Sequence, residues 1–470
     1  MKILLINPFG SNWIEGLRDN TESAVRLAPM GILFVASYLM KKGFEVDIHS
    51  CRSGERGAAE LMSKVTSLRP DMIGFTATTS GFMDAYRRAT EIRTALPDVK
   101  IVFGGVHVSA LREKILERFP LIDFLVTGEG EMAMADLAGG ADPGIIQGVI
   151  SRGAKGIQSG GIRTELCELD ELPFPAYSKL EGFPKFFEPP LFNYPRAPSA
   201  TIISSRGCPY QCSYCDRSVF RRSFRFNSAE YLYEQMVLLK KDFGVRHIFF
   251  YDDLFTFNRK RVEEFCGLIR KRPLHMTFNC AVRVGHADDA LLRMLKDAGG
   301  WMVSIGMESG DQELLDRHKA RVTLDQIRDT VRRIQGNGLR AKGLFMMGLP
   351  GETEQTVLRT ADFIEELGLD DMNMTKFTPF PGSPAYQTIF EEGTFEENWE
   401  LMNCLNFVFV PKGIESKEKM ERLYNRSIKR FYTGKNWIRK FGPLMFKCPD
   451  STFRLIKNLP TFLNIRKQFD

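Results

Sequence analysis

Arg206-Gly207-Cys208-Pro209-Tyr210-Gln211-Cys212-Ser213-Tyr214-Cys215 is a short, turn-rich segment that contains three cysteines. Their spacing is C-x3-C-x2-C, with an aromatic residue directly before the third cysteine. Cysteine is the usual ligand of a [4Fe–4S] cluster, which normally has four such ligands. Three thiolates leave one iron open to bind another molecule, and an open position distinguishes a reactive metal site from a structural one.

The other interpretations of these cysteines are weaker. A structural zinc site needs a fourth Cys or His close by. After Cys215 the next such residue is His247, and Cys266 stands alone. A disulfide is disfavoured in an intracellular chain, and core cysteines would not cluster beside Gly207 and Pro209. The segment is therefore predicted to hold an iron–sulfur cluster.

The cysteine segment resembles the signature of radical S-adenosylmethionine (SAM) enzymes. In that family the open iron binds the amino and carboxylate groups of SAM, and electron transfer cleaves SAM to a 5′-deoxyadenosyl radical. The resemblance implies that Cys208, Cys212 and Cys215 are the metal ligands. It also implies that Tyr214 lies beside the SAM adenine.

Composition indicates an ordinary globular protein. The 470 residues suit two or three domains, and 43% apolar and 26% charged residues are typical of soluble chains. The other six cysteines are scattered, which favours a reducing cytoplasm over a disulfide framework. The first apolar run is too short for a signal peptide, and no run of about 18 apolar residues predicts a membrane span.

Residues 1–150 alternate short apolar runs with amphipathic stretches. Strands are expected at 2–6, 45–49, 72–76, 100–103 and 124–126, with helices between them near 29–42, 57–68, 83–96 and 109–119. This alternation predicts an α/β domain with a parallel, doubly wound, Rossmann-like sheet. In such sheets ligands bind beyond the carboxyl ends of the strands.

The loops at those strand ends are rich in glycine, which lets a bulky ligand approach the backbone. Their candidate binding residues are Thr78, Gly104, Gly105, His107, Gly128 and Glu129. Taken together, the loops resemble the cobalamin-binding domain that precedes many radical SAM cores. Many cobalamin enzymes carry Asp-x-His-x-x-Gly after the first strand, but here the loop begins Asn7-Pro8-Phe9-Gly10. Cobalamin is therefore expected without a protein histidine on cobalt; the alternative is a degenerate domain that no longer binds it.

The remaining chain divides into three parts. Residues 151–198 are rich in proline and predict a linker. Residues 199–385 repeat a strand–helix pattern, with strands expected at 200–204, 247–251, 276–280, 302–306, 341–347 and 371–376. This part resembles the partial (β/α)6, TIM-like barrel of radical SAM enzymes, whose reactive groups collect at strand ends. There, Asp252, Arg283, Glu308 and Gly348 are expected to contact SAM.

Residues 386–470 are predicted to form a mainly helical, basic extension. From residue 412 onward the chain has 15 Lys or Arg and 5 Asp or Glu, a net charge of +10 against +6 for the whole chain. Such a local excess argues against an enzyme that binds nucleic acid. Residues 434–470 mix basic and large apolar side chains, which suits peripheral contact with an anionic membrane and hence a lipid-like substrate. The alternative is that these apolar residues cap the barrel.

The two resemblances together predict a cobalamin-dependent radical SAM enzyme, similar to the class that includes the anaerobic magnesium-protoporphyrin ester cyclase. Methylation of an unactivated carbon of a small or hydrophobic metabolite is favoured, with oxidative cyclisation, hydroxylation or rearrangement as the alternative. A reductase, flavodoxin or ferredoxin is expected as electron donor. A tRNA methylthiotransferase is excluded, because that family carries three N-terminal cysteines for a second cluster. The first 150 residues here contain only Cys51. A non-catalytic cobalamin or redox sensor is the alternative from another class.

Overall fold

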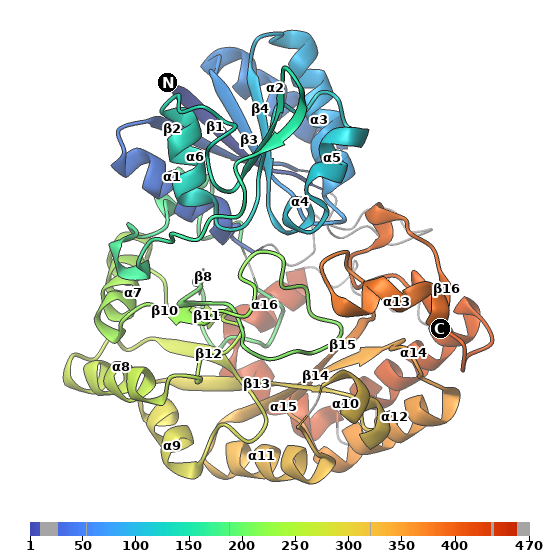
Figure 1. The fold of residues 1–470 in the computed structure, drawn as a ribbon. Helices are drawn as coiled ribbons and strands as arrows, with labels where there is room; N and C mark the ends of the chain where they lie inside the picture. Colours follow the sequence, from blue (N-terminus) through green and yellow to red (C-terminus); the bar gives the residue numbers. More distant parts are fainter. Residues whose placement is uncertain (10–26, 53, 188, 320, 434–436, 458–470) are drawn as a thin grey trace.

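The computed structural model describes residues 1–9, 27–52, 54–187, 189–319, 321–433 and 437–457. An N-terminal α/β domain (blue to teal) adjoins a half-barrel (green to orange), and the C-terminal helices (red) pack against the barrel (Figure 1). This arrangement confirms the fold class expected from the sequence.

The N-terminal domain is built on a sheet in the order β2-β1-β3-β4-β5-β6-β7. The first five strands are parallel. They are β1 (Lys2–Asn7), β2 (Glu45–Ser50), β3 (Met72–Thr76), β4 (Lys100–Gly104) and β5 (Phe124–Val126), within a residue of the predicted ranges. Ile3 and Leu5 enter one hydrophobic core and Leu4 and Ile6 another. Both faces of the sheet are buried, as a doubly wound sheet requires.

Helices cover both faces of this sheet (Figure 1). One face carries α1 (Met30–Lys41) and α6 (Gly130–Ala138). The other carries α2 (Gly54–Leu68), α3 (Phe82–Ala95), α4 (Val106–Leu111) and α5 (Glu113–Arg118). The last two replace the single helix predicted at 109–119, because Arg112 between them adopts a positive φ of 53° that a continuous helix excludes.

The sheet continues past the predicted domain boundary at residue 150. Strands β6 (Val149–Gly153) and β7 (Gly156–Ser159) form an antiparallel hairpin that pairs with β5. Residue 150 therefore lies inside β6, and the N-terminal sheet includes the first part of the segment predicted as a linker. The hairpin is short and its second strand is mostly exposed, so it has little hydrophobic pattern to indicate it.

The second domain is a parallel sheet in the order β15-β14-β13-β12-β11-β8. Its edges, β8 and β15, do not pair with each other, so the barrel is half-closed. All six predicted strands are present: β8 (Ser199–Ile202), β11 (His247–Phe250), β12 (Thr277–Val282), β13 (Gly300–Glu308), β14 (Arg340–Met347) and β15 (Asp371–Lys376). The helices are α7 (Ala229–Phe243), α8 (Arg259–Lys271), α9 (Asp289–Asp297), α10 (Gln312–His318), α11 (Leu324–Gly336) and α12 (Glu354–Leu367).

Each of these helices begins after a residue whose side chain accepts a hydrogen bond from the first turn. These capping residues are Ser228, Asn258, Asp288, Asp311, Thr323 and Thr353. Such caps satisfy backbone N–H groups that have no partner within the helix. The caps fix where each helix starts and therefore the length of the loop that follows each strand.

The C-terminal extension joins the two domains. It contains α13 (Pro384–Glu392), β16 (Gly393–Phe395), β17 (Phe409–Pro411), α14 (Lys417–Thr433), α15 (Trp437–Lys447) and α16 (Pro449–Lys457). Between β16 and β17, Trp399 and Leu401 enter the hydrophobic core on the α3 side of the N-terminal domain. No helix among the residues that the structure describes is both long and apolar enough to cross a membrane.

A polar loop covers the N-terminal ends of the barrel strands. Asn193 accepts a hydrogen bond from Lys342 Nζ at 2.7 Å and donates one to Asp371 at 3.1 Å. Helix α16 lies on this loop, since Asp450 accepts from the Ala197 N–H and Ser451 Oγ from the Phe192 N–H. The loop and α16 therefore cover the end of the barrel opposite to the strand C-termini.

Candidate active site

The cysteine loop follows β8 and is closed at its base by a small ribbon. Strands β9 (Ser205–Arg206) and β10 (Arg225–Phe226) pair in an antiparallel manner and enclose residues 207–224. Gly207 has φ of 88°, and a Cβ at this position would lie 2.2 Å from the Ser223 carbonyl oxygen. Only glycine allows the two ends of the loop to approach so closely.

The three predicted metal ligands lie in this loop at the C-terminal end of the barrel. Cys208 and Cys215 line one cavity, of about 390 Å³, and Cys212 lines another, of about 250 Å³. Burial and the nearby Asp253 raise the pKa of Cys215 to about 12, with smaller contributions from Cys212 and Cys208. Across the described part of the chain, no three Cys, His, Asp or Glu side chains are close enough together to hold one metal ion, and this includes the three cysteines themselves. A set of three thiols without a fourth ligand fits a cluster with an open iron.

The Cys212 side of the loop carries a cluster of cationic groups. Arg283, Lys319 and Arg321 line the smaller cavity together with Tyr210. Lys319 Nζ is 2.7 Å from the buried carboxylate of Glu308 and 3.4 Å from Tyr214 Oη. The structure thus brings Tyr214, Glu308 and Arg283 near Cys212, and their contact with SAM stays a prediction. Glu308 adopts a φ of 64°, a strained conformation of the kind found at functional sites.

Lys319 was missed by the sequence reasoning. It follows α10, eleven residues after Glu308, and belongs to no strand-end motif. The Glu308–Lys319 pair is buried on both sides, so each charged group has the other as its partner in a place nearly closed to water. Their carboxylate and ammonium groups suit the charged amino-acid end of SAM.

Two predicted SAM contacts have structural roles instead. Asp252 is buried and accepts hydrogen bonds from Ser204 N, Ser204 Oγ and Ser205 Oγ at 2.6–2.8 Å. Its neighbour Asp253 lines the larger cavity. Gly348 has φ of 98° and donates its N–H to Glu352.

Asp253 lines the cavity and Asp252 does not, because consecutive residues at a strand end point to opposite sides. Gly348 shapes the turn after β14, where burial raises the pKa of the Glu352 carboxyl to about 8.

The larger cavity extends from the cysteine loop into the N-terminal domain. Gly104, Gly105, Gly128 and Glu129 line it, together with apolar residues of the sheet, α1 and α6. Its wall includes Leu5, Gly74 and Val102, so it reaches the face of the sheet between these two helices. A deep apolar slot beneath glycine loops fits a large planar cofactor with a side arm.

Two residues of the predicted cobalamin set do not line this cavity. Thr78 is exposed and accepts a hydrogen bond from the Gly81 N–H in the turn before α3. His107 is completely buried, with its ring 4.4 Å from Trp399 and 4.8 Å from Phe82. Burial lowers the pKa of His107 to about 3. In this structure Thr78 caps a turn and His107 packs beneath the C-terminal extension, so neither prediction gains support from the cavity.

Comparison with known families decides the identity of the two domains. Residues 202–364 match the Radical SAM superfamily and residues 20–138 match the B12 binding domain. The chain therefore contains a B12-binding domain followed by a radical SAM domain. The predicted cofactor set of a [4Fe–4S] cluster, SAM and cobalamin is thereby confirmed.

Similar proteins include methyltransferases and a cyclase. A protein of Pyrococcus horikoshii named as an uncharacterized methyltransferase is 28% identical over 442 residues, covering 92% of each chain. The anaerobic magnesium-protoporphyrin IX monomethyl ester cyclase of Rubrivivax gelatinosus is 26% identical over 450 residues, covering 93% of this chain and 79% of the relative.

Solved structures support the fold. The cobalamin-dependent SAM radical enzyme OxsB, with aqua-cobalamin and SAM bound, has a TM-score of 0.72 at 18% identity, over 99% of this chain and 71% of that one. The radical SAM methyltransferase TsrM of Kitasatospora setae, with cobalamin and a [4Fe–4S] cluster bound, has a TM-score of 0.69 at 18% identity, over 92% and 88%.

Proposed function

We propose that the protein is a methyltransferase that acts on an unactivated carbon of a small molecule. The observation that supports this most is the 390 Å³ cavity, which joins the glycine loops of the B12-binding domain to Cys208 and Cys215. Both predicted cofactor sites would thus face one half-open cavity. When bound, the cluster and SAM supply a 5′-deoxyadenosyl radical, and cobalamin supplies a methyl group.

The chain's own residues would orient the reactants and exclude water. Glu308 and Lys319 present opposite charges at 2.7 Å and would hold the carboxylate and ammonium of SAM. Gly104, Gly105 and Gly128 leave room for close approach to the backbone. The apolar walls formed by α1, α6 and the sheet keep water from radical species, which is a main task of proteins that use such cofactors.

A product assay separates the candidate functions. Anaerobically reconstituted protein is incubated with SAM and a chemical reductant, and the nucleoside products are quantified. A methyltransferase is expected to form both 5′-deoxyadenosine and S-adenosylhomocysteine, because one SAM is cleaved and another donates its methyl group. A cyclase or hydroxylase would form only 5′-deoxyadenosine. Formation of neither product would support the sensor alternative and refute the proposal.

The cluster also needs a one-electron donor, and we propose a flavodoxin, a ferredoxin or a dedicated reductase. The support is a short basic stretch after Cys215, in which Arg221 and Arg222 are both exposed. Such a surface attracts acidic proteins and accelerates their association. Reduction by flavodoxin should slow with rising salt and on replacing Arg222 with Glu; a rate independent of both would contradict this partner.

We also propose that the C-terminal helices make peripheral contact with an anionic membrane. Phe446, Phe453 and Ile456 are 88%, 70% and 63% exposed, and Lys447 and Lys457 lie in the same two helices. Residues 434–436 and 458–470 of the predicted basic segment lie outside the described residues. Exposed aromatic groups among basic ones suit an anionic lipid surface.

The proposed membrane-contacting helix α16 lies far from the candidate active site. This helix lies on the loop at the N-terminal ends of the barrel strands, away from the cysteine loop. A lipid-like substrate is therefore a separate hypothesis. Flotation with anionic vesicles at low salt is expected to carry wild-type protein upward, and the Phe446→Ser and Phe453→Ser double variant should remain below. Wild-type protein that does not float would refute the membrane proposal.

A further inference from the structure

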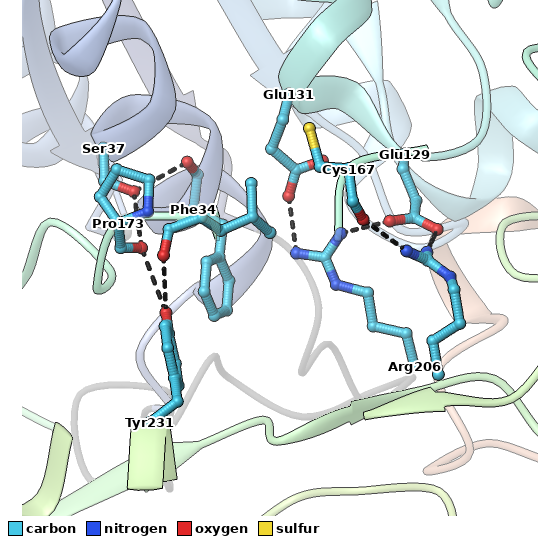
Figure 2. Close-up of polar contacts among 10 residues, drawn as sticks. Phe34, Ser37, Glu129, Glu131, Cys167, Pro173, Arg206 and Tyr231 are labelled. Atoms are coloured by element: carbon cyan, nitrogen blue, oxygen red, sulfur yellow. Dashed lines mark hydrogen bonds and ion pairs between the residues drawn. The ribbon is translucent and has the colours of Figure 1, made fainter. Parts of the chain in front are cut away.

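A buried network of four charges links the two domains (Figure 2). Arg206 and Arg225 come from the ribbon at the base of the cysteine loop, and Glu129 and Glu131 come from the start of α6. Arg206 donates to Glu131 at 2.7 Å and also to Glu129. Arg225 donates to the other oxygen of Glu129 and, at 2.9 Å, to the Cys167 carbonyl. The network is electrically neutral and its carboxylates are nearly completely enclosed.

This network lies on the wall of the cavity that both cofactor sites share. Arg206, Glu129 and Glu131 line the same 390 Å³ space as Cys208 and Cys215. Arg206 is separated from Cys208 only by Gly207, and Glu129 directly follows Gly128. The contact therefore connects the backbone that carries the cluster ligands to the glycine loop of the B12-binding domain.

The guanidinium of Arg206 is held from several sides. Its carbon lies 5.1 Å from the centre of the Phe34 ring on α1, and the two carboxylates hold its nitrogens. A planar guanidinium that binds two carboxylates fixes orientation as well as distance. Glu129 is the N-cap of α6 and Glu131 lies in its first turn, where the helix dipole favours negative charge.

Other hydrogen bonds also join these parts of the chain. Tyr231 on α7 donates to the carbonyls of Leu172 and Pro173 at 3.1 and 3.3 Å, and Ser37 on α1 also bonds to Pro173 (Figure 2). Tyr231 and Ser37 lie away from the cavity wall. Buried ion pairs also add little net stability, because desolvation offsets their attraction. A network in this place therefore suits a role in geometry better than one in stability.

We propose that Arg206 is the positioning residue that sets the cysteine loop against the Gly128–Glu131 loop, and so sets the separation of cluster and cobalamin. The inference rests on the proposed function, since it requires both cofactors in the cavity. A shift of about 1 Å between reacting groups can cost about 100-fold in rate. Lysine at position 206 keeps the charge but cannot reach both carboxylates with a planar fork.

The test compares four holoproteins by electron paramagnetic resonance: wild type, Arg206→Lys, the Arg206→Met and Glu131→Met double variant, and Tyr231→Phe as a control. Iron and cobalamin are quantified first, so that spectra are compared only for chains holding both. The readout is the magnetic interaction between the reduced cluster and cob(II)alamin, together with thermal stability. Arg206→Lys is expected to weaken the interaction, whereas Tyr231→Phe should leave it unchanged.

The double variant distinguishes positioning from adhesion. It removes one charge of each sign, so stability should return to near the wild-type value, while the magnetic interaction stays weakened. An unchanged interaction in folded Arg206→Lys, or an interaction restored together with stability in the double variant, would overturn the inference. If wild-type protein binds neither cofactor, the proposed function fails instead, and the two failures are therefore distinguishable.

Discussion

Replacing Gly105 with alanine is expected to destabilise the B12-binding domain strongly. Gly105 follows β4 with φ of 100° and ψ of −175°, a region that costs other residues about 1–3 kcal/mol. An added Cβ would lie 2.8 Å from both the N and the O of Ala77. Both atoms are already hydrogen-bonded, to Gly104 and His107, so the backbone cannot retreat. Overpacking adds about 1–3 kcal/mol, which gives a total loss of about 2–6 kcal/mol.

Gly43→Ala provides a matched control. Gly43 also has a positive φ, of 88°, but a Cβ there would meet nothing within 4 Å. Its replacement should cost only the strain of about 1–2 kcal/mol. The assay is urea unfolding of both variants without cofactors, with native-state hydrogen exchange of β3 and β4 to localise the effect. Equal losses in the two variants would show that the contact with Ala77 is not restrictive, and would refute the reasoning.

Three further outcomes are expected. Alanine at any predicted cluster ligand should abolish iron binding and SAM cleavage, whereas Cys280→Ala, in the core, should retain both. The iron content of each purified variant is the measurement. A triple variant that still binds a cluster would disprove the assignment. Burial raises the pKa of the Glu352 carboxyl from 4.5 to about 8. Its contribution to stability is therefore complete below pH 4.5 and is lost as pH rises through 8. Glu352→Gln should flatten that decline in a pH series of thermal unfolding, and a pH profile identical to that of the wild type would contradict the prediction. His107→Ala should lower the unfolding free energy by about 2–5 kcal/mol without altering the electron paramagnetic resonance spectrum of bound cob(II)alamin. Neither the wild type nor the variant should show nitrogen splitting from an axial imidazole. Splitting that is present in the wild type and disappears in the variant would place His107 on cobalt.

The sequence predicted the strands closely, because their signal is local. Hydrophobic runs of four to eight residues bounded by turns identify buried strands, and all eleven predicted strands are present. The cysteine loop was equally clear, since its meaning lies in spacing within one segment. Even the strand-end position of Glu308 followed from the pattern, because β13 ends at this residue.

The sequence did not reveal side-chain contacts whose two partners are distant in sequence. The environment of His107 depends on Trp399, which arrives with the C-terminal extension. Arg206 meets Glu129 and Glu131 across 77 and 75 residues. The choice between Asp252 and Asp253 depends on which side of one strand end faces the cavity. No periodicity in a single sequence encodes such pairings, since each belongs to the packing of two separately formed elements.

The cysteine loop forms a common wall between the two cavities, and it is held from both domains. On the barrel side, His318 links the hydroxyl of Ser213, at 2.7 Å, to the Pro350 carbonyl, at 2.7 Å. Because a carbonyl only accepts, Nε2 of His318 must donate, and burial lowers the pKa of this histidine, which favours the neutral ring with Nδ1 accepting. On the other side, Arg206 anchors the base of the loop to α6. A loop fixed at its middle and at its base has little freedom to adjust, so the geometry between the two cavities is set by the fold before any cofactor binds.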